Sequence, residues 1–115
     1  MFEDGSAGSL PTSVSRAAGL ALTKAMSKDL APAGIRVNAV CIGLIRSDQI
    51  ERMWQSAAPE LTWEAFAVDS RFQIPLGRIG DAQEAANVIT FLSSSAASYV
   101  TGSAVNIDGG TSAVL

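Results

Sequence analysis

The chain has 115 residues, which leaves room for one domain, because a domain commonly takes about 100 to 150 residues. Hydrophobic residues make up 48% of the chain and charged residues 17%, a composition that indicates apolar surface covered by a partner. The net charge is −3 without a basic stripe, and no apolar run approaches the roughly 20 residues of a membrane-spanning helix, so we expect neither nucleic-acid binding nor a membrane span.

The N-terminal segment is rich in glycine and serine and runs to Pro11, which is typical of a flexible lead-in. We therefore expect residues 1–11 to be a lead-in and residues 12–115 to form the domain. Apolar residues then recur at the i, i+3, i+4 spacing of one helical face, which predicts a helix over residues 13–30 with that face buried. The apolar positions are Val14, Ala17, Ala18, Ala21, Leu22, Ala25, Met26 and Leu30.

The first strand is predicted at residues 35–42. Pro32 and Gly34 end the preceding helix, because proline disfavours the helical conformation at the residue before it and glycine suits the turn. The run that follows is short, apolar and rich in β-branched residues, as is typical of a buried parallel strand. Gly43 ends this strand.

Three helices are predicted after the first strand. Ser47 or Asp48 is a suitable N-cap for a helix over residues 49–56. Thr62 is a suitable N-cap for one or two turns over residues 63–66. Asp81 and Glu84 have the spacing of a capping box, which predicts a helix over residues 81–93.

A second strand is predicted at residues 104–108, where Gly109 and Gly110 end it. A long connection that contains a helix makes adjacent strands parallel in nearly all cases. The fold class is therefore α/β, with two parallel strands plus helices. Because parallel strands normally have further neighbours, we expect one edge of the first strand to be open.

Four parts of the sequence together resemble the short-chain dehydrogenase/reductase family. The stretches SRAA, LTKAM and LAPAGIRVNAV in residues 15–40 resemble the active-site helix and the strand that follows it. The motifs IPLGR, SYVTG and VNIDGG in residues 74–78, 98–102 and 105–110 are similar to two loops and the last strand of the family. This resemblance implies a Rossmann-like, doubly wound parallel sheet that binds a dinucleotide, of which the chain supplies the C-terminal part.

The resemblance also implies hydride transfer between a nicotinamide and a carbonyl or alcohol carbon, with a Tyr-x-x-x-Lys pair that handles the proton. Counting along the motif places Thr12 at the tyrosine position and Arg16 at the lysine position. An aliphatic hydroxyl is a far weaker acid than a phenol, and a guanidinium does not replace an ammonium at the ribose hydroxyls. We therefore expect no intact catalytic pair in this chain.

Residues 42–47 are similar to the family loop that contacts the nicotinamide through main-chain groups. The resemblance implies that Gly43, Leu44, Ile45 and Ser47 bind the cofactor, NAD or NADP. An equally good interpretation is an ordinary strand-to-helix turn with Ser47 as the cap. No glycine-rich fingerprint lies between a strand and a helix, so we expect weak or absent cofactor binding by this chain alone.

Several other side chains have structural interpretations. The aromatic residues of the predicted helical insert either line a substrate pocket or form a lid or core; they are Trp54, Trp63 and Phe66. Tyr99, the only tyrosine, is expected to be a buried packing residue. Asn38 and Asp108 are expected to hydrogen-bond neighbouring main chain.

Histidine is absent and Cys41 is the only cysteine. Their scarcity argues against serine–histidine hydrolysis, a metal site of the usual zinc type and an internal disulfide. A single cysteine suits a reducing compartment, and with no secretory signal in residues 1–9 we expect a cytoplasmic protein.

The function favoured by these observations is a truncated oxidoreductase-like protein of this family that does not turn over substrate on its own. One alternative is a non-catalytic association module, because in the family the helices that resemble residues 13–30 and 81–93 take part in subunit packing. Its partner is a second copy, giving a homo-oligomer, or an intact subunit of the family. The other alternative is a fragment of a functional carbonyl or alcohol oxidoreductase similar to 3-oxoacyl reductases.

Overall fold

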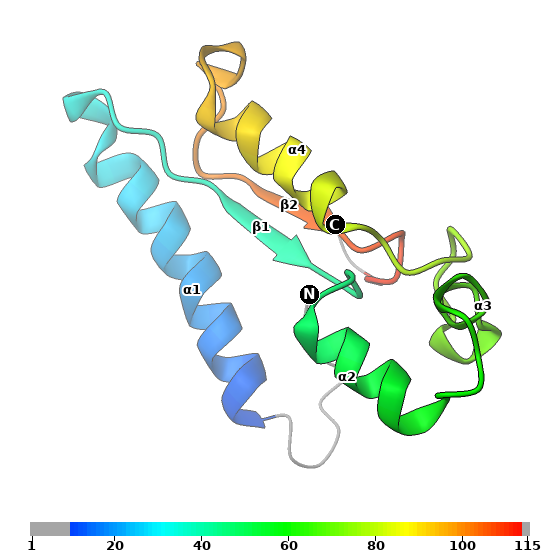
Figure 1. The fold of residues 1–115 in the computed structure, drawn as a ribbon. Helices are drawn as coiled ribbons and strands as arrows, with labels where there is room; N and C mark the ends of the chain where they lie inside the picture. Colours follow the sequence, from blue (N-terminus) through cyan, green and yellow to red (C-terminus); the bar gives the residue numbers. More distant parts are fainter. Residues whose placement is uncertain (1–9, 114–115) are drawn as a thin grey trace.

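The structure is a computed structural model and describes residues 10–113 of the chain. One strand follows the first helices, and a second strand comes after a long series of further helices (Figure 1). In order they are α1 (Leu10–Asp29), η1 (Ala31–Ala33), β1 (Ala39–Ile42), α2 (Asp48–Ala57), α3 (Trp63–Ala67), η2 (Ser70–Phe72), α4 (Ala82–Ser93), η3 (Ser95–Ala97) and β2 (Ala104–Ile107), where η marks a short 3-10 helix.

The two strands pair in parallel, with Ala39 opposite Ala104 and Ile42 opposite Ile107. The sheet lies between α1 and α4 (Figure 1). The connection from β1 to β2 contains α4. This arrangement confirms the α/β class and the parallel pairing. Because parallel strands run the same way, the segments that follow Ile42 and Ile107 leave the sheet side by side.

Helix α1 begins at Leu10, three residues before the predicted start. Pro11 lies in the first turn, where a proline costs nothing because the N–H groups there have no partner within the helix. The predicted lead-in is therefore wrong for residues 10 and 11, and residues 1–9 lie outside the described part. Gly34 ends the turn after α1 with φ of 75°, the left-handed conformation that favours glycine.

Strand β1 is shorter than predicted, because residues 35–38 bond to a distant loop instead of extending the sheet. The Val37 N–H donates to Thr101 Oγ1 at 3.1 Å, and the Gly102 N–H donates to the Val37 carbonyl at 2.7 Å. Asn38 donates through Nδ2 to the Val100 carbonyl at 2.9 Å and accepts from the Ser103 N–H at 3.1 Å. The predicted main-chain role of Asn38 is confirmed.

The predicted caps lie at the starts of the three later helices. Ser47 accepts from the Ile50 N–H at 3.4 Å and caps α2. Thr62 accepts from the Ala65 N–H at 3.2 Å and caps α3. At the start of α4 the Glu84 carboxylate accepts from the Asp81 N–H at 2.8 Å. The local sequence signals therefore predict these three helix starts well.

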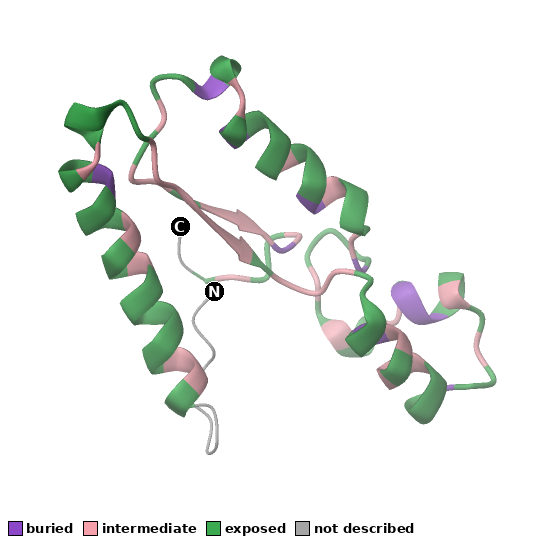
Figure 2. Ribbon diagram, turned by 60° about the vertical axis from the view of Figure 1, so that its left-hand side comes forward, coloured by how far each residue is buried: buried purple, intermediate pink, exposed green. Residues whose placement is uncertain are grey.

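The largest cluster of buried apolar residues lies in the insert between β1 and α4. Its buried members are Ile50, Ala58, Phe66, Ala67 and Ile79. The predicted buried face of α1 is instead largely exposed, since Val14 is 60% and Leu22 58% exposed and Ser27 is the buried residue of this helix (Figure 2). No helix among the described residues has the length and apolar character that a membrane crossing requires.

Arg36 connects the segment before β1 to the end of α4. Its guanidinium donates to the carbonyls of Leu92 at 2.7 Å, Ser94 at 3.1 Å and Val100 at 3.1 Å. The last carbonyls of a helix have no partner within the helix, and a positive charge there is favourable. Arg36 therefore fixes the connection between α4 and β2 to the sheet.

We expect Arg36→Met to lower the free energy of unfolding by about 2 kcal/mol, as for the loss of charged hydrogen bonds to partly buried carbonyls. Urea denaturation followed by circular dichroism measures the change. Arg52→Met is the matched control, because Arg52 donates within its own helix to the Asp48 carbonyl. Equal losses in the two variants would contradict this role.

Candidate functional site

The loop of residues 43–47 leaves the sheet at the carboxyl end of β1. The Gly43 N–H donates to the Ile107 carbonyl at 3.0 Å, which holds the loop against the end of β2. A methyl group on Gly43 would lie 2.6 Å from Asp108 Cβ and 2.8 Å from Asp108 Cα. Because backbone is in the way, glycine is required where the two chain segments cross.

The same loop pairs with residue Gly80 just before α4. The Gly80 N–H donates to the Leu44 carbonyl at 3.0 Å, and the Arg46 N–H donates to the Gly80 carbonyl at 2.8 Å, which makes a single parallel bridge at Ile45. In such a bridge the flanking residues bond to the partner, and the central residue points its own N–H and C=O to the other side. The main-chain groups of Ile45 therefore face away from Gly80.

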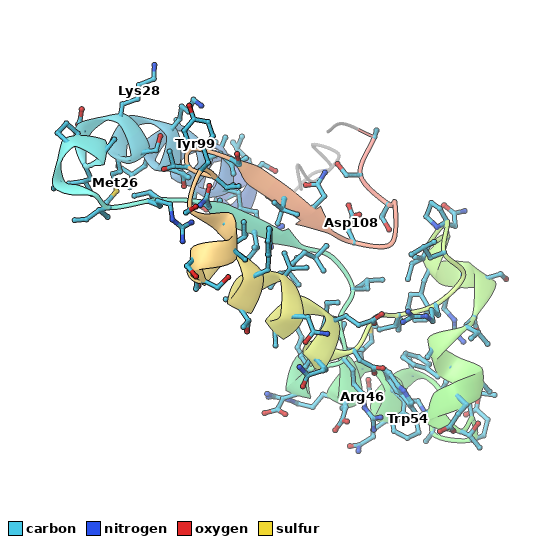
Figure 3. All side chains as sticks on the ribbon, turned by 90° about the horizontal axis from the view of Figure 1, so that it is seen from above. Met26, Lys28, Arg46, Trp54, Tyr99 and Asp108 are labelled. Atoms are coloured by element: carbon cyan, nitrogen blue, oxygen red, sulfur yellow. The ribbon has the colours of Figure 1, made fainter. Side chains whose placement is uncertain are left out.

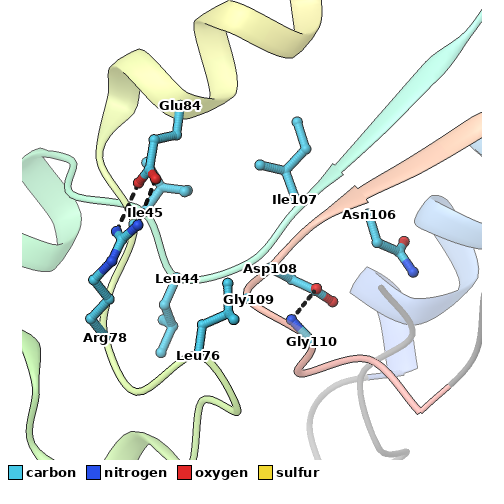
Figure 4. Close-up of a pocket in the computed structure, with 11 residues that line it drawn as sticks. Leu44, Ile45, Leu76, Arg78, Glu84, Asn106, Ile107, Asp108, Gly109 and Gly110 are labelled. Atoms are coloured by element: carbon cyan, nitrogen blue, oxygen red, sulfur yellow. Dashed lines mark hydrogen bonds and ion pairs between the residues drawn. The ribbon is translucent and has the colours of Figure 1, made fainter.

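Two cavities meet at this loop. One has a volume of about 640 Å³ and is lined by Arg16 of α1, by residues of the loop and by the first turns of α4. The other, of about 300 Å³, lies at the end of β2 and is lined by Arg78, Glu84 and Asp108 among others (Figure 4). Leu44 and Ile45 line both cavities, so the loop is their common wall. We call the larger cavity the Arg16 cleft.

The structure brings together most of the residues that the sequence predicts for the site. Arg16, Gly43, Leu44, Ile45 and Ser47 all line the Arg16 cleft. Ser47 lies there while it caps α2, so its capping interpretation is confirmed and its contact with a cofactor stays a prediction. Thr12 lies one turn before Arg16 in α1, is half-buried and is not among the residues that line the cleft.

The Arg78–Glu84 ion pair beside the loop was not predicted from the sequence. Arg78 binds Glu84 with both nitrogens of its fork, at 2.6 Å and 2.9 Å (Figure 4). The side-chain hydrogen bond from Arg78 and the Asp81 N–H hold the pKa of Glu84 at about 2, and Glu84 in turn raises the pKa of Arg78. The capping box indicated Glu84 but not Arg78, six residues earlier and outside the helix.

The aromatic residues of the insert form a core rather than a pocket. Phe66 is buried, and its ring lies 6.4 Å from that of Trp54 and 6.0 Å from that of Trp63. Trp54 donates through its ring N–H to the Leu61 carbonyl at 2.9 Å. The guanidinium of Arg46 lies 4.4 Å from the centre of the Trp63 ring, a cation–π contact that connects the loop to this core.

Tyr99 does not contribute to the site. Its side chain is fully exposed, so the prediction that it is buried is wrong for the described residues. It lies at the same end of the molecule as Met26, away from Arg46 (Figure 3). Asp108 is buried and accepts from the N–H groups of Gly110 at 3.0 Å and Ser112 at 2.9 Å, which confirms its predicted main-chain role.

The comparisons with known proteins agree on one family. A family model described as enoyl-(acyl carrier protein) reductase matches residues 3–112. The 3-oxoacyl-(acyl-carrier-protein) reductase FabG of Thermotoga maritima is 41% identical over 106 residues, which are 92% of this chain and 39% of that protein.

Solved structures are similar over most of the chain. An apo structure of a short-chain oxidoreductase from Pseudomonas aeruginosa PAO1, described as containing an atypical catalytic center, matches with a TM-score of 0.84 and 40% identity over 90% of this chain and 41% of that one. An NADPH-bound structure with the same description and organism matches with a TM-score of 0.78 and 38% identity over 92% of this chain and 40% of that one. The chain therefore spans about two fifths of the length of these relatives.

We expect the Glu84 carboxyl to titrate near pH 2 and Arg78→Met to move its pKa toward the ordinary value of 4.5. Because the pKa of Glu84 is lower in the folded chain than in the unfolded chain, its ionised carboxylate stabilises the fold. This contribution is present above about pH 4.5 and is lost as the pH falls from about 4.5 to 2. The carboxyl carbon shift in an NMR titration measures the effect. Arg71→Met is the control, because Arg71 pairs with Asp69 and should leave Glu84 unchanged.

Proposed function

Because the chain belongs to the short-chain dehydrogenase/reductase family, we propose that it forms the nicotinamide side of an NAD(P)-dependent oxidoreductase site. The observation that carries this proposal is the Arg16 cleft, where a cationic side chain of α1 and the loop after β1 line one cavity. Ligands bind beyond the carboxyl ends of the strands in open parallel sheets. The cleft lies at that end of β1.

The residues of the cleft fit part of a nicotinamide cofactor. The main-chain N–H and C=O of Ile45 face away from Gly80 and are suited to a carboxamide, which is both a donor and an acceptor. Arg16 supplies a positive charge, and Ser47 a hydroxyl, for the ribose or phosphate oxygens. A bound nicotinamide would supply or accept the hydride, and these residues would hold and orient it.

This chain has no counterpart of the Tyr-x-x-x-Lys pair that handles the proton in the family. Arg16 keeps the positive charge of the lysine position, whereas Thr12 at the tyrosine position has no acidic phenol and lies outside the lining of the cleft. We propose that the chain binds the cofactor weakly and does not reduce substrate on its own. The cofactor part of this proposal is supported by a relative, since a short-chain oxidoreductase of Pseudomonas aeruginosa has an NADPH-bound structure.

We expect weak, saturable binding of NADPH in a fluorescence titration of the full chain. Arg16→Met should weaken this binding by roughly fivefold or more, as for the loss of one charge-assisted contact. Lys28→Met is the matched control, because it removes a positive charge from the other end of the same helix (Figure 3). An Arg16→Met protein that binds NADPH as well as the parent chain would refute the proposed site.

The same protein distinguishes binding from catalysis. NADPH oxidation with a 3-oxoacyl thioester should not exceed the rate without protein, because no phenol lines the Arg16 cleft to donate the proton. Turnover that Thr12→Val abolishes would contradict the proposed lack of catalysis and leave the cofactor site in place.

A second candidate function is association with another subunit. Apolar side chains on α1 and α4 are exposed, among them Leu10 (71%), Leu22 (58%) and Phe91 (49%). Exposed apolar area of this kind marks an interface with another protein. Support for a partner from the same family comes from the resemblance of both helices to those that pack between subunits.

If this second function is correct, light scattering at micromolar concentration should give the mass of a dimer or larger species. Leu22→Glu should shift the mass toward the monomer, because a charge would have to be buried at the contact. Gln55→Glu adds the same charge at an exposed position of α2 and serves as the control. A stable, cooperatively folded monomer would rule out the association module.

A further inference from the structure

Residues 78–81 form a short segment that lies between the loop of residues 43–47 and α4. Gly80 bonds to both neighbours of Ile45, by accepting from the Arg46 N–H at 2.8 Å and donating to the Leu44 carbonyl at 3.0 Å. These two bonds determine where the main-chain groups of Ile45 point. The position of Gly80 therefore determines the geometry of the loop that lines the Arg16 cleft.

Space at Gly80 is restricted on the side that faces Ile45. A methyl group there would lie 2.7 Å from Ile45 Cδ1 and 3.4 Å from Glu84 Oε2. Gly80 is not one of the glycines with positive φ, so alanine suits its backbone and only the available space demands glycine. Because Cδ1 is the end of a flexible side chain, alanine would displace Ile45 rather than unfold the chain.

The segment is held in place from its other side by the Arg78–Glu84 ion pair (Figure 4). Glu84 binds the Asp81 N–H and the Arg78 fork at once, so it connects the residues on both sides of Gly80 to the first turn of α4. Both ionic side chains are nearly half exposed, which limits the energy of the pair. Its bidentate geometry nevertheless restricts the direction of the segment.

We infer that Gly80 is a positioning residue, braced by Arg78 and Glu84, that holds Ile45 in place for the nicotinamide cofactor. The role of the cofactor in this inference rests on the proposed function. The positioning of Ile45 by Gly80, Arg78 and Glu84 rests on the hydrogen bonds described above. Gly80 acts through Ile45 and need not touch the cofactor itself. A methyl group on residue 80 would displace the side chain of Ile45, a residue that lines the cleft.

The test compares Gly80→Ala with the parent chain by two measurements, amide hydrogen exchange at Arg46 and NADPH affinity. We expect exchange at Arg46 to become roughly fivefold faster, the change produced by weakening one main-chain hydrogen bond. We expect NADPH affinity to fall by roughly tenfold, because small displacements of positioning groups have large effects. The melting temperature should change little.

A second substitution makes the test specific. Ile45→Val removes Cδ1, the atom that a methyl group on Gly80 would meet. In the Gly80→Ala background it should restore both the Arg46 exchange rate and NADPH affinity, because Ile45 is proposed to contact the cofactor through its main chain. Gly19→Ala is the matched control, since a methyl group there meets nothing within 4 Å.

The ion pair is tested by Arg78→Met, which removes the fork and adds no atom near Ile45. We expect exchange at the Gly80 amide to become roughly twofold faster, a smaller effect than that of Gly80→Ala because the pair is exposed. An unchanged exchange rate at Gly80 would show that the ion pair does not help to position this residue.

The two measurements separate failure of the brace from failure of the proposed function. Arg46 exchange that is the same in Gly80→Ala and the parent chain, or that Ile45→Val does not restore, would overturn the positioning role whatever the NADPH affinity. A parent chain that binds no NADPH would overturn both the proposed function and the cofactor part of this inference, while the exchange data still decide whether Gly80 positions the loop.

Discussion

The close contact between Gly43 and Asp108 is the constraint on which the candidate site depends. Parallel pairing of β1 with β2 brings the ends of both strands to one edge, and a methyl group on Gly43 would lie 2.6 Å from Asp108 Cβ. Asp108 is buried and fixed in turn by the N–H groups of Gly110 and Ser112. The loop after β1 can therefore leave the sheet in one direction, toward Gly80 and α4.

After Gly43, the loop of residues 43–47 is held by contacts on two sides. Gly80 pairs with Leu44 and Arg46 by main-chain hydrogen bonds, and the guanidinium of Arg46 packs on Trp63 at 4.4 Å. The second contact connects the loop to the aromatic core of the insert. A loop fixed in this way holds Ile45, which lines the Arg16 cleft, with little freedom, and such pre-organisation would favour the proposed binding of a cofactor.

The departure from the family pattern at two positions has different consequences for binding and for chemistry. Arg16 places a positive charge in the cleft, and we propose that this charge attracts an anionic cofactor. Thr12 has a hydroxyl that is far less acidic than a phenol, and we propose that the proton step therefore lacks its donor. In free-energy terms, ground-state binding and transition-state stabilisation are separable, and a substitution can remove the second while it leaves part of the first.

The amino-acid sequence by itself determined the features that depend on neighbouring residues. The caps at Ser47, Thr62 and Asp81, the α/β class and the parallel strands were all predicted, because capping and periodicity act over a few positions. The family resemblance, which carries long-range information that local patterns lack, indicated five of the residues that line the Arg16 cleft: Arg16, Gly43, Leu44, Ile45 and Ser47.

Only the tertiary structure decided the features that depend on distant contacts. Residues 35–38 were predicted to be strand but lie outside β1, because Arg36 and Asn38 bond to carbonyls 56 to 64 residues away. Tyr99 and the apolar face of α1 are exposed, since burial requires a neighbour that a helical or loop pattern does not specify. The bridge between Ile45 and Gly80 joins residues with no shared motif, and it exists because the end of β1 and the start of α4 meet in space.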